Sequence, residues 1–427
     1  MRKTGKLQIK SRNYLSFGKV LLLCFFLYIL NPVSSQTIRK ISRDELRDKI
    51  SGYWIGQCVG NYLGFPFEGT YLEDPIPVLI DRYYQYGDAP ELHINSDLRG
   101  YCKTVAYWME GAFSDDDTDI EFVTLHGVEK YGLDINYSEI TEMWKLHINR
   151  KIWCANRTAR NLMTNGLIPP ATGSKINNPD WYQIDPQLVN EIWSVFYPGM
   201  VNKSAERAEW GARITSDDWG THPTIAYAVM YSAAFFENDV NQLVALAMKF
   251  IPGDSPFHEG MKDIIEWRKL HDDWRTTRKL IFDKYYRYSK GDYSAPVSDV
   301  SSLSNGLMGI MAILYGDGDF VKTAGIAVSA GIDCDNQAAT CAGLIAVMNG
   351  GSSIPERLTL GMSEKPAWSK PFNDTYINFS RDGLPVITKI SDIVNRIMII
   401  TEEAILSNGG QRISEGNMVY YLVRSDI

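Results

Sequence analysis

Two short acidic segments hold the residues best suited to chemistry in this sequence. The first, Ser114–Asp119, places four aspartates within five positions, and the second, Gly331–Asn336, has two aspartates spaced two apart and then an asparagine. Carboxylate, hydroxyl and carboxamide oxygens are the ligands of hard divalent cations such as Mg²⁺, Mn²⁺ and Ca²⁺. No HExxH-type histidine pair is present, so the residues do not favour zinc.

The residues around the two acidic segments indicate a metal site to different degrees. Acidic residues are common in the first turn of a helix, so Ser114–Asp119 taken alone is more simply interpreted as a solvated helix start. It is not an EF-hand loop, because Ile120 stands where that loop needs glycine. Asp333 and Asp335 instead lie between small and apolar residues at 324–330 and 338–346. Unpaired carboxylates are costly to bury there, and a bound divalent cation would remove that cost.

A helix starting near Ser42 is the clearest of the elements that must position these residues. Ser42 and Glu45 have the spacing of a capping box, and apolar residues follow at four-residue intervals. Four glycines recur every fourth residue along one face: Gly52, Gly56, Gly60 and Gly64. Glycine costs about 1 kcal/mol relative to alanine in a helix, so something must approach this face closely. Tight helix packing is favoured over a ligand site.

Helical periodicity predicts an all-α fold, a single compact multi-helix domain, because few segments alternate with a period of two. Stretches 165–200 and 258–300 are expected to be irregular or polar, with a half-buried helix around 267–274. Further helices are predicted at 104–112, 120–131, 225–236, 240–250, 306–314, 320–330, 337–348 and 387–406.

The N-terminus has the layout of a secretory signal peptide. Six basic residues and no acidic residue occur in the first 36 positions, with an apolar run at 20–30 and small residues after it. The run is shorter than the ~20 residues that span a bilayer, although a membrane anchor is the alternative. We therefore predict a signal peptide at 1–36, a domain at 37–427, and export to the periplasm or the cell exterior.

The overall charge limits the classes of partner. The formal net charge is −8, and no basic patch is evident, which argues against binding to nucleic acid or anionic membranes. Five scattered cysteines follow the apolar run, which is neither a disulfide framework nor a CxxC metal pattern.

Three motifs in order resemble the ADP-ribosylglycohydrolase family over roughly residues 42–406. Gly56–Glu68 resembles its first-helix pattern GxxxGDxxGxPxE, Asp115–Thr118 its DDT metal motif, and Gly331–Thr340 its GxDxD(T/C)xAA motif. The resemblance implies a pair of Mg²⁺ ions, or Mn²⁺ in their place. It implies Glu68 beside the substrate ribose, and Asp333 or a metal-bound water as the candidate catalytic base. The metal ligands that it implies are Asp115, Asp116, Asp117, Asp333, Asp335 and Asn336.

The sequence also departs from the family pattern. Asn61 replaces the usual aspartate, Asn336 stands where many members have threonine or cysteine, and the middle region around Gly220 lacks the usual glycine-tyrosine-glycine pattern. In that region Trp219 is a candidate for stacking on a purine and His222 for touching substrate. The alternative for both is a structural role in the core.

These observations favour a magnesium-dependent hydrolase of a ribosyl glycosidic bond, with an ADP-ribosyl group, free or protein-linked, as the first candidate substrate. Two alternatives remain: an exported hydrolase of a nucleoside or other glycoside, and a non-catalytic binding protein that retains the fold. The altered positions Asn61 and Asn336 motivate the last alternative, whereas the two acidic clusters argue against it.

Overall fold

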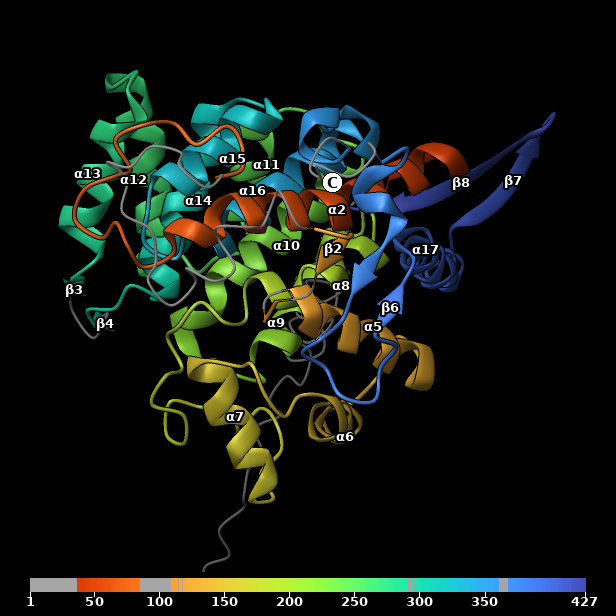
Figure 1. Ribbon diagram of the computed structural model, residues 1–427, viewed down its shortest axis with the longest axis horizontal. Coiled ribbons are helices and arrows are strands. Elements are labelled where there is room, and N and C mark those ends of the chain that lie inside the picture. The colour runs from red at the N-terminus through yellow and green to blue at the C-terminus, as the bar shows by residue number, and fades with distance from the viewer. Residues whose placement is uncertain are drawn as a thin grey trace, which may run out of the picture.

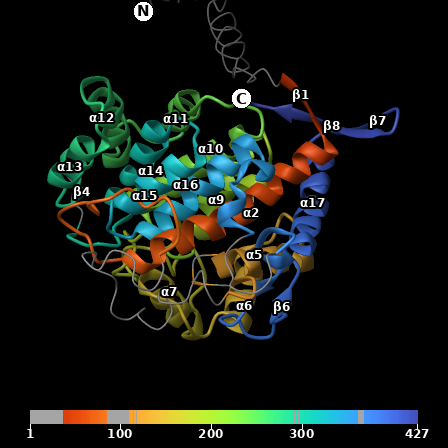
Figure 2. The ribbon, with the colours of Figure 1, turned by 45° about the horizontal axis from the view of Figure 1, so that its top comes forward.

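Two adjacent helices, α2 (Arg43–Gly64) and α16 (Cys334–Asn349), run through the middle of the molecule (Figures 1 and 2). Their backbones are in close contact, since a β-carbon at Gly60 would come within 2.1 Å of the Ala338 carbonyl oxygen. The other three glycines of the stripe also face α16 or the residues after it. The side chain of Ser42 accepts a hydrogen bond from the Glu45 N–H group and caps α2. The glycine stripe is therefore a helix-packing surface, as predicted.

The remaining helices surround this pair, and the hydrophobic core is continuous among them. The computed structural model describes residues 37–84, 109–113, 115–116, 118–290, 293–294, 296–360 and 368–427. Together these confirm the predicted mostly helical single domain. The other helices are α5 (Thr118–Tyr131), α6 (Tyr137–His147), α7 (Cys154–Thr164), α8 (Ile192–Phe196), α9 (Val201–Ala212), α10 (His222–Ala234), α11 (Val240–Met248), α12 (Pro256–Leu270), α13 (Trp274–Tyr285), α14 (Ser302–Gly316), α15 (Phe320–Ser329) and α17 (Ile390–Ser407). Short 3-10 helices include η1 (Phe65–Phe67), η2 (Leu188–Asn190) and η3 (Asp218–Thr221).

Some segments differ from the sequence prediction. Residues 104–108 of one predicted helix lie outside the described residues, and its end forms strand β2 (Ala112–Phe113) instead. Most of the stretch 258–300, expected to hold only a short helix, forms α12 and α13. Ser255 and Asp273 cap these two helices with their side chains. The many polar residues on their outer faces obscured, in the sequence, the apolar face of each helix that packs against α14.

Three small sheets complete the fold in the ranges that the structure describes. Antiparallel strands β1 (Thr37–Ser42), β8 (Met418–Ser425) and β7 (Gln411–Glu415) form the first, in that order. The second joins β2 to β5 (Tyr376–Ile377) and β6 (Ile387–Thr388), and β3 (Ser289–Lys290) pairs with β4 (Tyr293–Ser294). Among the described residues, none of the helices has the length and hydropathy needed to cross a membrane. The apolar run at 20–30 lies outside these residues, so the signal peptide and export remain predictions.

Candidate metal centre

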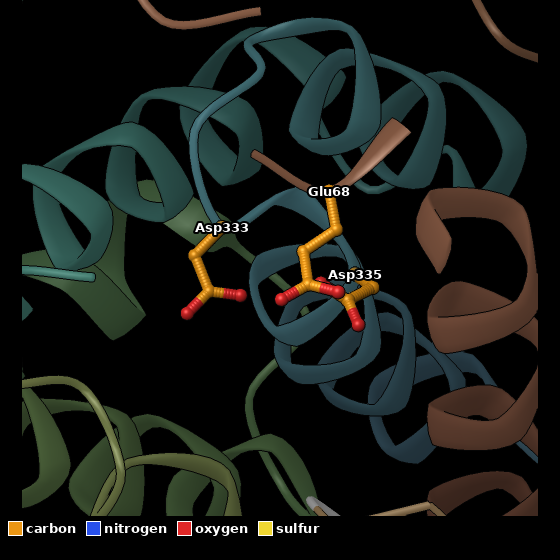
Figure 3. A group of neighbouring side chains, drawn as sticks. All are labelled: Glu68, Asp333 and Asp335. Carbon is orange, nitrogen blue, oxygen red and sulfur yellow. The ribbon is translucent and has the colours of Figure 1, made fainter. Parts of the chain in front are cut away.

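Three carboxylates from distant parts of the chain meet at the N-terminal end of α16. Each of Glu68, Asp333 and Asp335 offers an oxygen atom, and these atoms lie within 4.8 Å of one another. Figure 3 shows the three side chains together. Glu68 directly follows η1, Asp333 directly precedes α16, and Asp335 belongs to the first turn of that helix. The helix dipole there stabilises negative charge.

Two backbone hydrogen bonds join the segments that carry Glu68 and Asp333. The Gly69 N–H group donates to the Ile332 carbonyl at 2.9 Å, and the Ile332 N–H group donates to the Tyr71 carbonyl at 2.8 Å. Ile332 has a φ of +64°, and Gly331 before it has a φ of +76°. A left-handed conformation is uncommon for a β-branched residue and costs of order 1–3 kcal/mol, which the surrounding contacts must offset. The paired backbone therefore holds a strained turn that sets the direction of Asp333.

The first acidic segment contributes charge to the same place. Asp115 and Asp116 precede α5, where the Asp115 carboxylate accepts a hydrogen bond from the Thr118 N–H group at 3.2 Å. After Asp335 and burial, the charge of Asp116 also raises the pKa of Glu68, and after burial and Asp335 it adds to the raised pKa of Asp333. Asp117 lies outside the described residues.

Mutual repulsion and burial dominate the electrostatics of this cluster. The pKa of Glu68 lies well above its usual range because Asp335 is close, and because the side chain is buried. Burial and then the charge of Asp335 raise the pKa of Asp333, and burial raises the pKa of Asp335. The Oδ1 atom of Asp335 is buried without a hydrogen-bond partner in the described part of the chain. Carboxylate oxygens gathered in this way fit a hard divalent cation, which would offset their repulsion.

Asp119, the fourth aspartate of the first segment, has a different environment. Its Oδ1 atom lies 2.6 Å from the Arg381 Nε atom, and both side chains are fully buried. Burial raises the pKa of Asp119 to about 6, while Arg381 acts in the opposite direction. The Arg381 guanidinium also donates hydrogen bonds to the carbonyls of Arg150 and Lys151, each at 2.7 Å. Asp119 is thus part of a buried ion pair that ties the segment after β5 to α5.

Asn336 follows Asp335 in the first turn of α16 and is buried. Asn61 lies in α2, fully buried, and neither atom of its amide group has a hydrogen-bond partner within the described ranges. The proposed role of Asn336 as a ligand remains a prediction.

The two candidate substrate residues lie in the region of η3 and α10. Trp219 is buried in an aromatic cluster, with its ring centroid 5.0 Å from that of Trp181. The His222 Nδ1 atom lies 2.7 Å from the Ser255 hydroxyl, and burial lowers the pKa of His222 to about 4. These contacts fit the structural alternative that the sequence left open. Among the described residues, neither Trp219 nor His222 is seen to contact the three carboxylates. Their substrate role therefore stays a prediction.

Two residues near the cluster were not anticipated from the sequence. The charge of Asp299 raises the pKa of Glu68, and a β-carbon at Gly69 would lie 3.9 Å from the Asp299 Oδ2 atom. Asn305, in the first turn of α14, accepts a hydrogen bond from the Asp333 N–H group at 3.1 Å. The sequence signal that could have identified Asp299 is its place just before a helix, which it shares with the two acidic segments.

Comparison with known proteins identifies the family of this sequence. The family model described as ADP-ribosylglycohydrolase matches residues 42–382. A solved structure described as "ADP-ribosylglycohydrolase-related protein complex" superposes with a TM-score of 0.51 at 16% identity, covering 84% of this chain and 99% of that one. A search of curated proteins gave no match. The structural likeness concerns the fold, whereas the family match spans most of the sequence and includes all three motifs. The chain belongs to the ADP-ribosylglycohydrolase family.

Proposed function

We propose that this protein is a Mg²⁺- or Mn²⁺-dependent hydrolase that cleaves a ribosyl glycosidic bond, with an ADP-ribosyl group as the first candidate substrate. The observation that carries the proposal is the convergence of Glu68, Asp333 and Asp335, with the charge of Asp116 beside them. A helix start by itself does not need three mutually repelling carboxylates, so a ligand of opposite charge is the simplest reason for the arrangement.

The residues that would hold the cations are Asp115, Asp116, Asp333 and Asp335, with Asp117 and Asn336 as further ligands expected from the family resemblance. Bound divalent cations would neutralise the cluster and orient the oxygen atoms of the sugar and of a water molecule. Their oxygen-only ligand set suits Mg²⁺ or Mn²⁺ better than zinc.

Glu68 and Asp333 would carry out the remaining catalytic tasks. Cleavage of a glycosidic bond passes through an oxocarbenium-like state, which a nearby carboxylate stabilises. Glu68, on the turn after η1, would face that developing positive charge. Asp333, held by its backbone at the start of α16, would accept the proton of the attacking water through a carboxylate oxygen.

A second candidate substrate follows from the predicted signal peptide. If the protein is exported, a nucleoside or another small ribosyl glycoside is an available substrate outside the cytoplasm. Either substrate uses the same carboxylates, so the two proposals differ only in the group attached to the ribose.

The test begins with calorimetric titration of MnCl₂ and MgCl₂ into the purified protein and into an Asp333→Ala/Asp335→Ala variant. Asp283→Ala serves as the control, since Asp283 is an exposed acid paired with Lys279 in α13. We expect saturable binding to the parent and the control, and none to the double variant. Release of ADP-ribose or ribose from ADP-ribosylated peptides and nucleosides then identifies the substrate. A parent protein that binds neither cation would overturn the proposed mechanism and favour a binding role for the fold.

A further inference from the structure

The side chain of Asn305 makes three hydrogen bonds although it is wholly buried. Its Oδ1 atom accepts from the Asp333 N–H group at 3.1 Å. Its Nδ2 group donates to the Asp299 carbonyl at 2.6 Å and to the Ser301 carbonyl at 3.0 Å. One amide group thus connects the backbones of Asp333, which belongs to the carboxylate cluster, and Asp299, whose charge acts on Glu68.

The backbones of Asp333 and Asp299 are held partly by contacts from outside their own segments, through the side chain of Asn305. Asp333 follows two residues with left-handed backbone conformations, and its own side chain makes no cap hydrogen bond to α16. The hydrogen bond from its N–H group to Asn305 therefore acts together with the backbone hydrogen bonds of Ile332 to fix its position. Asp299 lies before α14, its carbonyl accepts from the Asn305 Nδ2 group, and its charge acts on Glu68. The repulsion between Asp299 and Glu68 opposes the close approach of these segments, and the hydrogen bonds of Asn305 act against it.

We propose that Asn305 is a positioning residue that fixes the backbones of Asp333 and Asp299 at the separation required for cation binding. This inference rests on the proposed function. Asparagine suits the role because one short side chain supplies an acceptor for the Asp333 N–H group and a donor for the Asp299 carbonyl. An aspartate of the same shape has no donor, and its second oxygen would face two carbonyl oxygens.

The aspartate variant separates geometry from charge. Asn305→Asp adds a negative charge near the cluster, which by electrostatics alone would strengthen the attraction for a cation. If Asn305 acts through position, the lost donor bonds weaken cation binding despite the added charge. The two explanations therefore predict changes of opposite sign.

Asn178 provides a matched control. It is also wholly buried, and its Nδ2 group lies within hydrogen-bond distance of the carbonyls of Ala155, Thr172 and Thr215. Its Oδ1 atom accepts from the Asp180 N–H group at 3.0 Å. Replacing it with alanine should destabilise the protein as Asn305→Ala does, without a direct effect on the segments that carry Asp333 and Asp299.

The experiment measures the Mn²⁺ dissociation constant by calorimetry, and the Mn²⁺-induced rise in Tm, for the parent, N305A, N305D and N178A. We expect at least tenfold weaker binding in N305A and N305D, and parental affinity in N178A. If N305A does not fold, the Mn²⁺ affinity of N305D and its Mn²⁺-induced rise in Tm test the inference instead. Unchanged or tighter Mn²⁺ binding in N305D would overturn the inference while the proposed function stands. A parent that binds no Mn²⁺ would overturn both.

Discussion

Gly64, the last residue of α2, lies directly against the backbone of Asp335: a β-carbon at Gly64 would come within 2.4 Å of the Asp335 Cα atom. The close packing of the two central helices therefore extends up to the carboxylate cluster. Its last contact sets where the chain leaves α2 and enters η1, four residues before Glu68. Packing and ligand geometry are linked at this position.

Gly64→Ala should disturb both stability and cation binding. Alanine is the better helix former by about 1 kcal/mol, but overlap with backbone atoms cannot be relieved by rotating a side chain. Overpacking of this kind typically costs ~1–3 kcal/mol, so the variant should be less stable in urea unfolding. The matched control is Gly52→Ala, whose β-carbon would come within 2.5 Å of the Ala346 carbonyl oxygen, far along α2 from the cluster. Both should lose stability, but only Gly64→Ala should bind Mn²⁺ more weakly. Parental stability of Gly64→Ala would show that the helices separate easily.

Asp335→Asn should stabilise the protein in the absence of metal. The charge of Asp335 is the main cause of the raised pKa of Glu68 and also raises the pKa of Asp333. Removing it relieves that repulsion, and each 1 kcal/mol gained is worth ~2–4 °C in Tm for domains of 150–250 residues. Thermal unfolding in EDTA should therefore show a higher Tm for the variant, whereas added Mn²⁺ should raise the Tm of the parent alone. A lower Tm in EDTA would mean that Asp335 serves the fold rather than a ligand.

Asp119→Ala should separate the structural aspartate of the first acidic segment from the candidate ligands. The variant leaves the guanidinium of Arg381 buried without its carboxylate partner, which typically costs ~3–5 kcal/mol. Asp116→Ala should instead relieve repulsion and weaken Mn²⁺ binding. Urea unfolding and Mn²⁺ titration of both variants should give opposite patterns. Loss of Mn²⁺ binding in a folded Asp119→Ala protein would place Asp119 among the ligands.

The stability of the protein should fall as the pH rises from about 4.5 to about 8. Two buried carboxyl groups do not belong to the cluster: Glu191 accepts from the Gln57 side chain at 2.9 Å, and Glu121 accepts from the Ile192 N–H group at 2.9 Å. Burial raises the pKa of Glu191 to about 8, and burial and then Glu191 raise the pKa of Glu121. No basic side chain is among the causes of either shift.

The sign of this dependence follows from the protonated form. A carboxyl group with a raised folded-state pKa favours folding while it is neutral. That contribution is complete below the unfolded-state pKa, near 4.5, and is lost as the pH rises through the folded-state value. Urea unfolding at pH 5, 6, 7 and 8 should show the decline, and Glu191→Gln should make it shallower. A variant with the same slope as the parent would remove Glu191 as its source.

The sequence sufficed for the features that depend on local pattern. Helix α2 was predictable because Ser42 caps it and its apolar and glycine faces repeat with helical spacing. The acidic clusters were visible as residue types, and Asp333 and Asp335 stood out against their apolar surroundings. Asp119 was not separable from its neighbours, since its partner Arg381 lies far along the chain. Asn305 was hidden for the same reason: its role arises from hydrogen bonds across a turn that sequence spacing does not reveal.

The sheet formed by β1 and β8 has a consequence for the order of folding. Thr37 pairs with Ser425, so strand β1 obtains its partner only after the residues up to β8 have been synthesised. Contacts so distant in sequence form slowly, because the intervening chain must be brought together first. During synthesis strand β1 therefore has an unpaired edge that can pair with another chain until β8 closes it.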